Sequence, residues 1–266
     1  MSIPKIIHYC WFGKGEKNEL VNKCIKSWEQ YCPDYKIIEW NEMNYNILTN
    51  KYVRDAYKEK KWAFVSDYVR TDVIYKYGGI YLDTDVEVIN PLERLLDFHA
   101  FFGVESQNLN INTGLGFGAE QYNDIVKKLR DMYDDISFYK KNGELNLTSC
   151  PIYITKFFEE LGYIKNNKIQ TIKNIEILPS DRFSPYDYKT GKINLSKDTF
   201  SIHWYNASWF DEDDKKIHDM EVNIQKKINS KIALVFCFIY RKLFRVIMAL
   251  KRGELIKLFK RKLKKG

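Results

Sequence analysis

Residues 77–89 read YGGIYLDTDVEVI, which sets two carboxylates, Asp83 and Asp85, into an apolar and β-branched run. The run predicts a buried strand. An isolated carboxylate taken out of water costs several kcal/mol, so this pair needs a counter-charge or solvent. Alternation along a strand would point both side chains to one face. The stretch therefore predicts a strand whose end carries a pair of acidic side chains.

Such a pair has two interpretations. At the C-terminal end of a strand, where open α/β sheets bind ligands, two carboxylates form an oxygen-only site suited to Mg²⁺ or Mn²⁺. A divalent ion held there can bridge a diphosphate and stabilise charge on a leaving group. The alternative is that both aspartates are solvated residues at the strand end, or that one caps a turn.

The segments before this stretch alternate between strand and helix patterns. The predicted strands cover residues 5–12 (KIIHYCWF) and 35–40 (YKIIEW), and the predicted helices cover 18–32 and 62–77. Gly78 and Gly79 end the second helix in the manner of a left-handed cap. A β-α-β start of this kind predicts a parallel sheet covered by helices.

The rest of the chain continues the pattern and ends in a distinct segment. Further strands are predicted over residues 99–105 and 111–119, helices over 122–133 and 152–162, and a closing strand and loop over 200–209. No internal repeat or low-complexity linker separates these elements. The simplest division is one domain, residues 1–211, followed by a helical extension, residues 212–266.

Composition and charge limit the function classes. The apolar content of 45% and aromatic content of 15% exclude a disordered or fibrous chain. Residues 228–266 hold twelve Lys/Arg and one acid, Glu254, a local net of +11, so the formal charge of +8 leaves −3 for the other residues. The main domain is therefore mildly acidic, which argues against nucleic-acid binding.

The cysteines and the N-terminus indicate the compartment. Five cysteines at irregular spacing, without a C-x-x-C pair, predict reduced thiols and neither a disulfide framework nor a zinc site. The first residues lack a basic leader and a small-residue cleavage site. We therefore expect a cytoplasmic protein.

Residues 63–88, AFVSDYVRTDVIYKYGGIYLDTDVEV, combine S-D-x-x-R with G-G-x-Y-x-D-x-D. This combination resembles the signature of family-32 glycosyltransferases, which include yeast mannosyltransferases and bacterial capsule enzymes. It is more distantly similar to the glucosylating domains of the large clostridial toxins. The resemblance covers residues 3 to about 210. It implies a GT-A-type α/β fold: a Rossmann-like, nucleotide-sugar-binding mixed sheet flanked by helices.

The resemblance also implies roles for residues of the signature. Asp85 resembles a direct ligand of the metal. Asp83 resembles a residue that touches the ribose or sugar hydroxyls of the donor and reaches the ion directly or through water. Asp67 and Arg70 match a pair that grips the transferred sugar, and Tyr81 matches a residue near the nucleotide. Residues at i and i+3 do share a helix face, although a surface salt bridge between Asp67 and Arg70 is the alternative.

Two further segments resemble donor-binding parts of the family. YCWFG (9–13) resembles a first strand in which backbone groups, as at Cys10, and an aromatic ring, Trp11, hold a uracil; an ordinary core tryptophan is the alternative. NINTGLGFGA (110–119) resembles a strand that faces the donor sugar through Asn112, unless this asparagine forms a turn. LTSCPIYIT (147–155) resembles a T-G-P segment but departs from it at Ser149 and Cys150, and no chemistry is assigned to it.

The segment SIHWYNASW (201–209) supplies the last candidates. In related sugar transferases a C-terminal histidine or another polar residue completes the metal site, and a Ser/Trp pair on a loop covers the diphosphate. These roles correspond to His203, with Asn206 as a competing ligand, and to Ser208 and Trp209. The alternatives are a structural histidine and a tryptophan that fills the core.

The basic extension predicts an address on a membrane. Eight apolar residues, Ile232–Ile239, precede Arg241, Lys242 and Arg245. This run is too short and too charged for a spanning helix and suits a helix in the headgroup layer of an anionic surface. A helical pair packed on the domain and a homo-oligomer contact are the alternatives.

Together these features predict a hexosyltransferase that depends on Mn²⁺ or Mg²⁺, and the resemblance implies that it retains the configuration at the anomeric carbon. The predicted donor is a UDP-hexose, with galactose or glucose, and the predicted acceptor is a glycan or lipid-linked oligosaccharide of bacterial surface (capsular) polysaccharide synthesis, at the inner face of the cell membrane. A phosphatase with an aspartyl nucleophile fits poorly, because Glu87 stands where those enzymes carry Thr or Val. A non-catalytic glycan-binding scaffold with a degenerate transferase fold is the other alternative.

Overall fold

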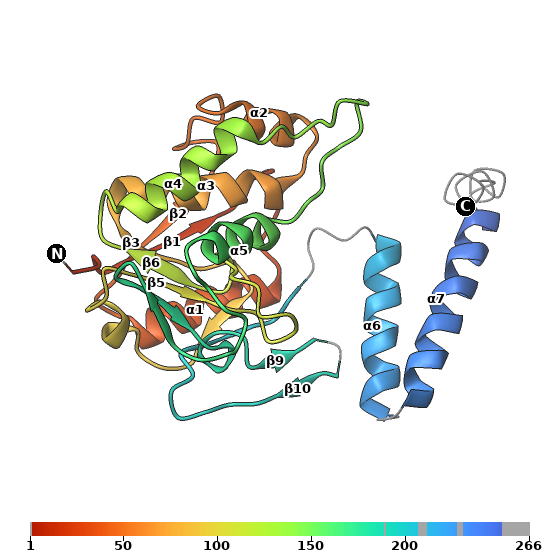
Figure 1. Ribbon diagram of the computed structural model, residues 1–266. Helices are drawn as coiled ribbons and strands as arrows, with labels where there is room; N and C mark the ends of the chain where they lie inside the picture. The colour runs from red at the N-terminus through yellow and green to blue at the C-terminus, as the bar shows by residue number, and fades with distance from the viewer. Residues whose placement is uncertain (1, 189, 207–211, 228–230, 252–266) are drawn as a thin grey trace. The chain divides into compact units, whose positions relative to one another are not determined.

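The computed structural model describes residues 2–188, 190–206, 212–227 and 231–251 (Figure 1). The chain divides into two compact units. The first consists of Met1–Tyr186 and Ile193–Tyr205, and the second of Asp187–Lys192 and Asn206–Gly266. The predicted domain boundary after residue 211 stays a prediction.

The first unit is built on a seven-stranded mixed sheet in the order β2-β1-β3-β6-β5-β8-β7. The strands are β1 Ile6–Cys10, β2 Lys36–Trp40, β3 Gly79–Tyr81, β5 Ala100–Gly103, β6 Phe117–Ala119, β7 Gln170–Ile172 and β8 Ile175–Leu178. Strand β1 runs parallel to β2 and β3, whereas β6 runs antiparallel to both β3 and β5. The predicted mixed α/β fold is confirmed, and an all-parallel sheet is not formed because β6 enters in the opposite direction.

Helices cover both faces of this sheet (Figure 1). The helices are α1 Glu19–Tyr31, α2 Lys51–Lys58, α3 Trp62–Tyr77, α4 Asp124–Asp135 and α5 Cys150–Glu160, with 3-10 turns η1 Glu93–Leu95 and η2 Ser180–Arg182. One apolar core includes Val53, Val69 and Ile154, from α2, α3 and α5. A second core includes Cys24 and Trp28 of α1. The site residues described below therefore stand on a sheet that is packed on both sides.

Helix α3 leads directly into the central strand β3. Gly78 and Gly79 have φ values of 64° and 101°, and the Gly78 N–H donates to the carbonyl of Ile74 at the helix end. A Cβ on Gly79 would lie 2.7 Å from the backbone oxygen of Ile6 in β1. Glycine is therefore required both by the left-handed backbone and by the close approach of the neighbouring strand.

His8 fixes the same junction from the side of β1. Its Nδ1 accepts a hydrogen bond from Trp40 Nε1 at 3.0 Å, and its Nε2 lies 2.9 Å from the carbonyl oxygen of Gly78, to which it donates. Burial lowers the pKa of His8 to about 4, so the ring is neutral at pH 7. His8 is therefore a structural residue that ties β1 to the start of β3.

The D-x-D stretch is a turn rather than one continuous strand. Strand β3 ends at Tyr81, the Val86 N–H donates to the Asp83 carbonyl at 3.0 Å, and β4 follows as Val86–Val88. The expectation that alternation along a strand aligns Asp83 and Asp85 is therefore wrong. A turn directly after β3 brings the two carboxylates together at the C-terminal end of this strand.

Strand β4 pairs antiparallel with β11, Ser201–His203, in a separate two-stranded sheet. His203 stands opposite Val86, the residue directly after the turn. The predicted closing strand is confirmed over these three residues. This pairing carries a histidine from the C-terminal part of the first unit to the D-x-D turn.

The second unit contains the helices α6, Glu212–Lys227, and α7, Lys231–Lys251. A short ribbon of β9, Tyr186–Asp187, and β10, Lys192–Ile193, lies earlier in the chain. Among the helices that the structure describes, none is both long and apolar enough to cross a membrane.

Candidate functional site

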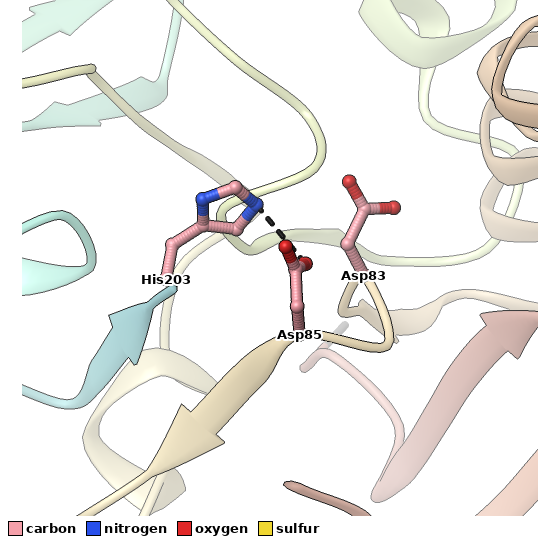
Figure 2. A group of neighbouring side chains, drawn as sticks. All are labelled: Asp83, Asp85 and His203. Carbon is pink, nitrogen blue, oxygen red and sulfur yellow. Dashed lines mark ion pairs between the residues drawn. The ribbon is translucent and has the colours of Figure 1, made fainter. Parts of the chain in front are cut away.

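Three side chains converge at the end of β3: Asp83, Asp85 and His203 (Figure 2). One potential ligand atom from each lies within 4.8 Å of those of the other two. Two carboxylate oxygens and one imidazole nitrogen form a donor set that suits Mn²⁺, and the carboxylates also suit Mg²⁺. The geometry of these residues therefore fits a divalent cation.

The histidine of this cluster is held by a carboxylate. His203 Nε2 lies 3.2 Å from Asp85 Oδ1, and both side chains are largely buried. Burial alone would lower the pKa of His203, but Asp85, together with the charges of Asp83 and Glu105, outweighs this effect and the pKa is raised. Within the described residues, His203 Nδ1 is buried without a hydrogen-bond partner. A cation bound by these two groups would compete with the proton of His203.

Arg70 links the helix α3 to the D-x-D turn. Its Nη2 lies 3.1 Å from Asp67 Oδ1 and 3.2 Å from Asp83 Oδ1, and its Nε donates to the Ser66 carbonyl at 3.1 Å. The Arg70 side chain is 4% exposed and that of Asp67 is 10% exposed. The pair is therefore buried and is not a surface salt bridge.

The electrostatics of this pair depend on the arginine. Burial raises the pKa of Asp67 to about 6, and the charge of Arg70 acts in the opposite direction. Loss of hydration in the protein also raises the pKa of Asp83, and the charge of Arg70 again acts in the opposite direction. One guanidinium thus opposes the effect of burial on both carboxylates and favours their charged forms.

Asp83 is fixed on its other sides by Tyr81 and Gly114. The Tyr81 hydroxyl donates to Asp83 Oδ1 at 3.0 Å, and the Tyr81 ring centre lies 4.9 Å from the Arg70 guanidinium. The Asp83 N–H donates to the Gly114 carbonyl at 3.1 Å. A Cβ on Gly114 would lie only 2.1 Å from Asp83 Oδ2. The Asp83 carboxylate therefore has its present position only because residue 114 lacks a side chain.

Gly114→Ala is expected to reduce turnover of the UDP-hexose donor predicted from the sequence at least about tenfold, measured at saturating Mn²⁺. The reason is that the Asp83 carboxylate must leave Arg70 and Tyr81 to make room for the new methyl group. The stability should fall little, since the carboxylate can swing toward solvent. Steady-state kinetics and thermal melting check this. Gly15→Ala is the matched control, because a Cβ there meets nothing within 4 Å. Equal turnover in the two variants would contradict the placement of Asp83.

Asn112 organises the loop that carries Gly114. Its Oδ1 accepts from the Gly114 N–H at 2.7 Å, and its Nδ2 donates to Glu105 Oε1 at 2.8 Å. The predicted strand over residues 111–119 is formed only at Phe117–Ala119, because this side chain stabilises a turn before it. The contacts of Asn112 are those of a turn-forming residue, and its contact with a donor sugar stays a prediction.

Two residues that the structure places near the candidate site, Glu105 and Cys150, were not predicted from the sequence. Glu105 follows β5, which runs in the same direction as β3 because both pair antiparallel with β6. Its charge contributes to the raised pKa of His203. Cys150, at the start of α5, is buried and acts to lower the pKa of Asp67. An acid directly after an apolar run, as in AFFGVE, was the available signal for Glu105, whereas nothing local marks Cys150.

The structure describes three of the five remaining candidate residues and leaves two of them outside its described ranges. Cys10 is buried, and burial raises the pKa of its thiol to about 12. Trp11 is half-buried, and its Nε1 donates to the Gly15 carbonyl at 2.7 Å. Asn206 belongs to the second unit. Ser208 and Trp209 lie outside the described residues.

Residues 18–102 match the family described as the glycosyltransferase sugar-binding region containing a DXD motif. Inositol phosphoceramide mannosyltransferase 3 of Schizosaccharomyces pombe is 32% identical over 127 residues, which are 44% of this chain and 33% of that protein. Mannosyl phosphorylinositol ceramide synthase SUR1 of Saccharomyces cerevisiae is 25% identical over 248 residues, which are 90% of this chain and 60% of that protein. The chain thus spans one third to three fifths of the length of these relatives.

Among solved structures, the PaToxG glycosyltransferase is similar with a TM-score of 0.47 and 18% identity. The similarity covers 60% of this chain and 70% of that chain.

Proposed function

We propose that this chain, which carries a glycosyltransferase sugar-binding region with a DXD motif at residues 18–102, transfers a hexose from a nucleotide sugar to a hydroxyl group of a glycan acceptor. The observation that carries the proposal is the cluster of Asp83, Asp85 and His203 beside the buried Asp67–Arg70 pair. The cluster provides ligands for a cation, and the pair provides an acceptor and a cationic group for a sugar and its phosphates.

For the donor we propose a UDP-hexose with glucose or galactose. The resemblance of the YCWFG segment to a uracil-binding strand supports UDP. Mannose is the competing sugar, because the two yeast relatives are named for mannosyl transfer. All three sugars are hexoses, so the proposal of hexosyl transfer is common to them.

For the acceptor we propose a glycan on a lipid carrier, in the synthesis of a surface polysaccharide. The names of both yeast relatives contain a ceramide, which supports an acceptor with a lipid part. Arrival of the acceptor from a lipid surface would also fit the basic extension of this chain.

In the proposed reaction Asp83, Asp85 and His203 would hold Mn²⁺ or Mg²⁺. The cation, when bound, supplies positive charge that stabilises the diphosphate leaving group. Arg70, Tyr81 and the Gly114 carbonyl fix the position of Asp83. Asp83 would therefore be pre-organised as a ligand before the cation binds. The proposed ligands would therefore need little rearrangement when a cation and a donor bind.

Asp67 and Arg70 would orient the transferred sugar. Asp67 is ionised at neutral pH, since its pKa is raised only to about 6, and can accept hydrogen bonds from sugar hydroxyls. Arg70 keeps that carboxylate in place and adds a positive charge at the donor side of the site. We further propose that the configuration at the anomeric carbon is retained by a front-face route, in which the leaving phosphate assists the incoming hydroxyl.

A panel of UDP-glucose, UDP-galactose and GDP-mannose, each with Mn²⁺ or with EDTA, tests the proposal through hydrolysis of the donor. We expect hydrolysis of one hexose donor with Mn²⁺ and its loss with EDTA. Absence of turnover with every nucleotide sugar, in a protein that still binds glycan, would refute the enzyme and favour the scaffold. Turnover unaffected by EDTA would refute the metal assignment alone.

A further inference from the structure

The helix α7 presents three different faces. One face packs on α6 (Figure 1): the thiol of Cys237 donates to the Glu221 carbonyl at 3.8 Å, and Arg241 Nε donates to Glu221 Oε1 at 2.8 Å. Cys237 is buried there, together with Ile217 of α6. This face is therefore satisfied within the second unit.

A second face of α7 is apolar and exposed. Its side chains recur at intervals of three and four residues, which places them along one stripe of a helix with about 3.6 residues per turn. They are between 39% and 57% exposed. The apolar stripe consists of Phe236, Ile239, Leu243, Val246, Ile247 and Leu250. Packing on α6 does not cover these residues, so the stripe is not needed for that contact.

The third face is basic and borders the apolar stripe. Lys242 and Arg245 are exposed there, and Lys242 lies one turn from Ile239 and Val246 of the stripe. The sequence of α7 contains no acidic residue. The charge of residues 228–266 is +11, so α7 belongs to the strongly basic part of the sequence. An anionic lipid surface would attract the basic residues and cover the apolar stripe at the same time.

We infer that α7 docks the chain on an anionic lipid surface, with the apolar stripe in the acyl-headgroup boundary and Lys242 and Arg245 against the lipid phosphates. A second copy of the chain is a poorer occupant, because pairing the two stripes would bring their basic borders toward each other. The lipid surface instead attracts that border, with about 1 kcal/mol for each basic residue near it, which corresponds to about a fivefold change in binding.

Co-sedimentation of residues 1–266 with lipid vesicles tests this docking. The amount of protein that sediments with vesicles of phosphatidylglycerol and phosphatidylcholine in equal parts is compared with the amount that sediments with pure phosphatidylcholine. We expect binding to the anionic vesicles that weakens with salt. The pair Ile239→Gln and Leu243→Gln should weaken binding at least about tenfold, because apolar burial is lost. The pair Lys242→Gln and Arg245→Gln should weaken it about 25-fold, about fivefold for each charge.

Matched controls lie on α6. Met220→Gln removes an exposed apolar side chain and Lys216→Gln removes an exposed charge, and neither should change vesicle binding. Circular dichroism checks that the helices persist in all variants. Sedimentation of the wild type equal with and without phosphatidylglycerol, or equal binding by stripe variants and controls, would overturn the inference. So would light scattering in which the stripe variants turn a dimer into a monomer while the wild type ignores vesicles.

Discussion

Asp85→Asn is expected to lower Mn²⁺-dependent donor turnover by about 10³-fold or more while the protein stays folded. The change keeps the shape of the side chain but removes a negative charge from a cluster in which Asp85 also pairs with His203 at 3.2 Å. A metal ion contributes several kcal/mol of charge stabilisation in a transition state, and about 1.4 kcal/mol corresponds to a factor of ten. The loss should appear in turnover measured across a Mn²⁺ titration.

A carboxylate on α2 that is buried to a similar extent provides the control for this variant. Asp55 lies one helix turn from Lys51 and pairs with it at 3.0 Å. Asp55→Asn therefore removes an equal charge from a residue that is not part of the Asp83, Asp85 and His203 cluster. Its turnover should match the wild type. Thermal melting of both variants separates loss of function from loss of fold. Wild-type Mn²⁺-dependent turnover in Asp85→Asn would exclude this carboxylate as a metal ligand.

Arg70→Met is expected to cost about 3–5 kcal/mol in the free energy of unfolding, or roughly 10 °C in melting temperature. The substitution keeps much of the volume of the side chain but leaves Asp67 buried beside Asp83 without a counter-charge. Urea denaturation at pH 7 measures the loss. Arg94→Met is the control, since Arg94 is 64% exposed and pairs with Asp198 only at the surface.

A double variant distinguishes charge from packing in this prediction. Arg70→Met combined with Asp67→Asn should recover part of the lost stability, because the second change removes the unpaired buried charge. Arg70→Lys should fall between Arg70→Met and the wild type, since lysine keeps the charge but cannot reach two carboxylates with a planar fork. An Arg70→Met protein as stable as the wild type would show that the pair is not an electrostatic anchor.

The sequence predicted the first half of the sheet well for a physical reason. Strands β1 and β2 and the helices α1 and α3 are each specified by local apolar spacing and by caps such as Asn18, which accepts from the Val21 N–H, and Gly78. The stop at Tyr81 was not predicted, because the β-branched run continues to Val88 and local propensity favours a strand throughout. The turn within it is set by tertiary contacts, among them the Asp83–Gly114 hydrogen bond.

The site was predictable to the extent that its residues share one signature. Asp67, Arg70, Asp83 and Asp85 lie within 19 consecutive residues of the sequence, and the resemblance of that stretch to a known signature grouped them. Glu105, Gly114 and Cys150 join the site through the pairing of β5 with β6 and the packing of α5. Of these three, only Glu105 has a local signal, as an acid directly after an apolar run. His203 was predicted only through the family resemblance, and the β4–β11 pairing explains how it reaches the turn.

The most direct measurement of the central claim is anomalous scattering at the manganese edge from a crystal soaked with Mn²⁺ and UDP. The account predicts a manganese peak within coordination distance of the Asp85 carboxylate and His203 Nε2, in contact with the diphosphate. A crystal in which UDP occupies the chain while no manganese lies beside Asp83, Asp85 or His203 would contradict it.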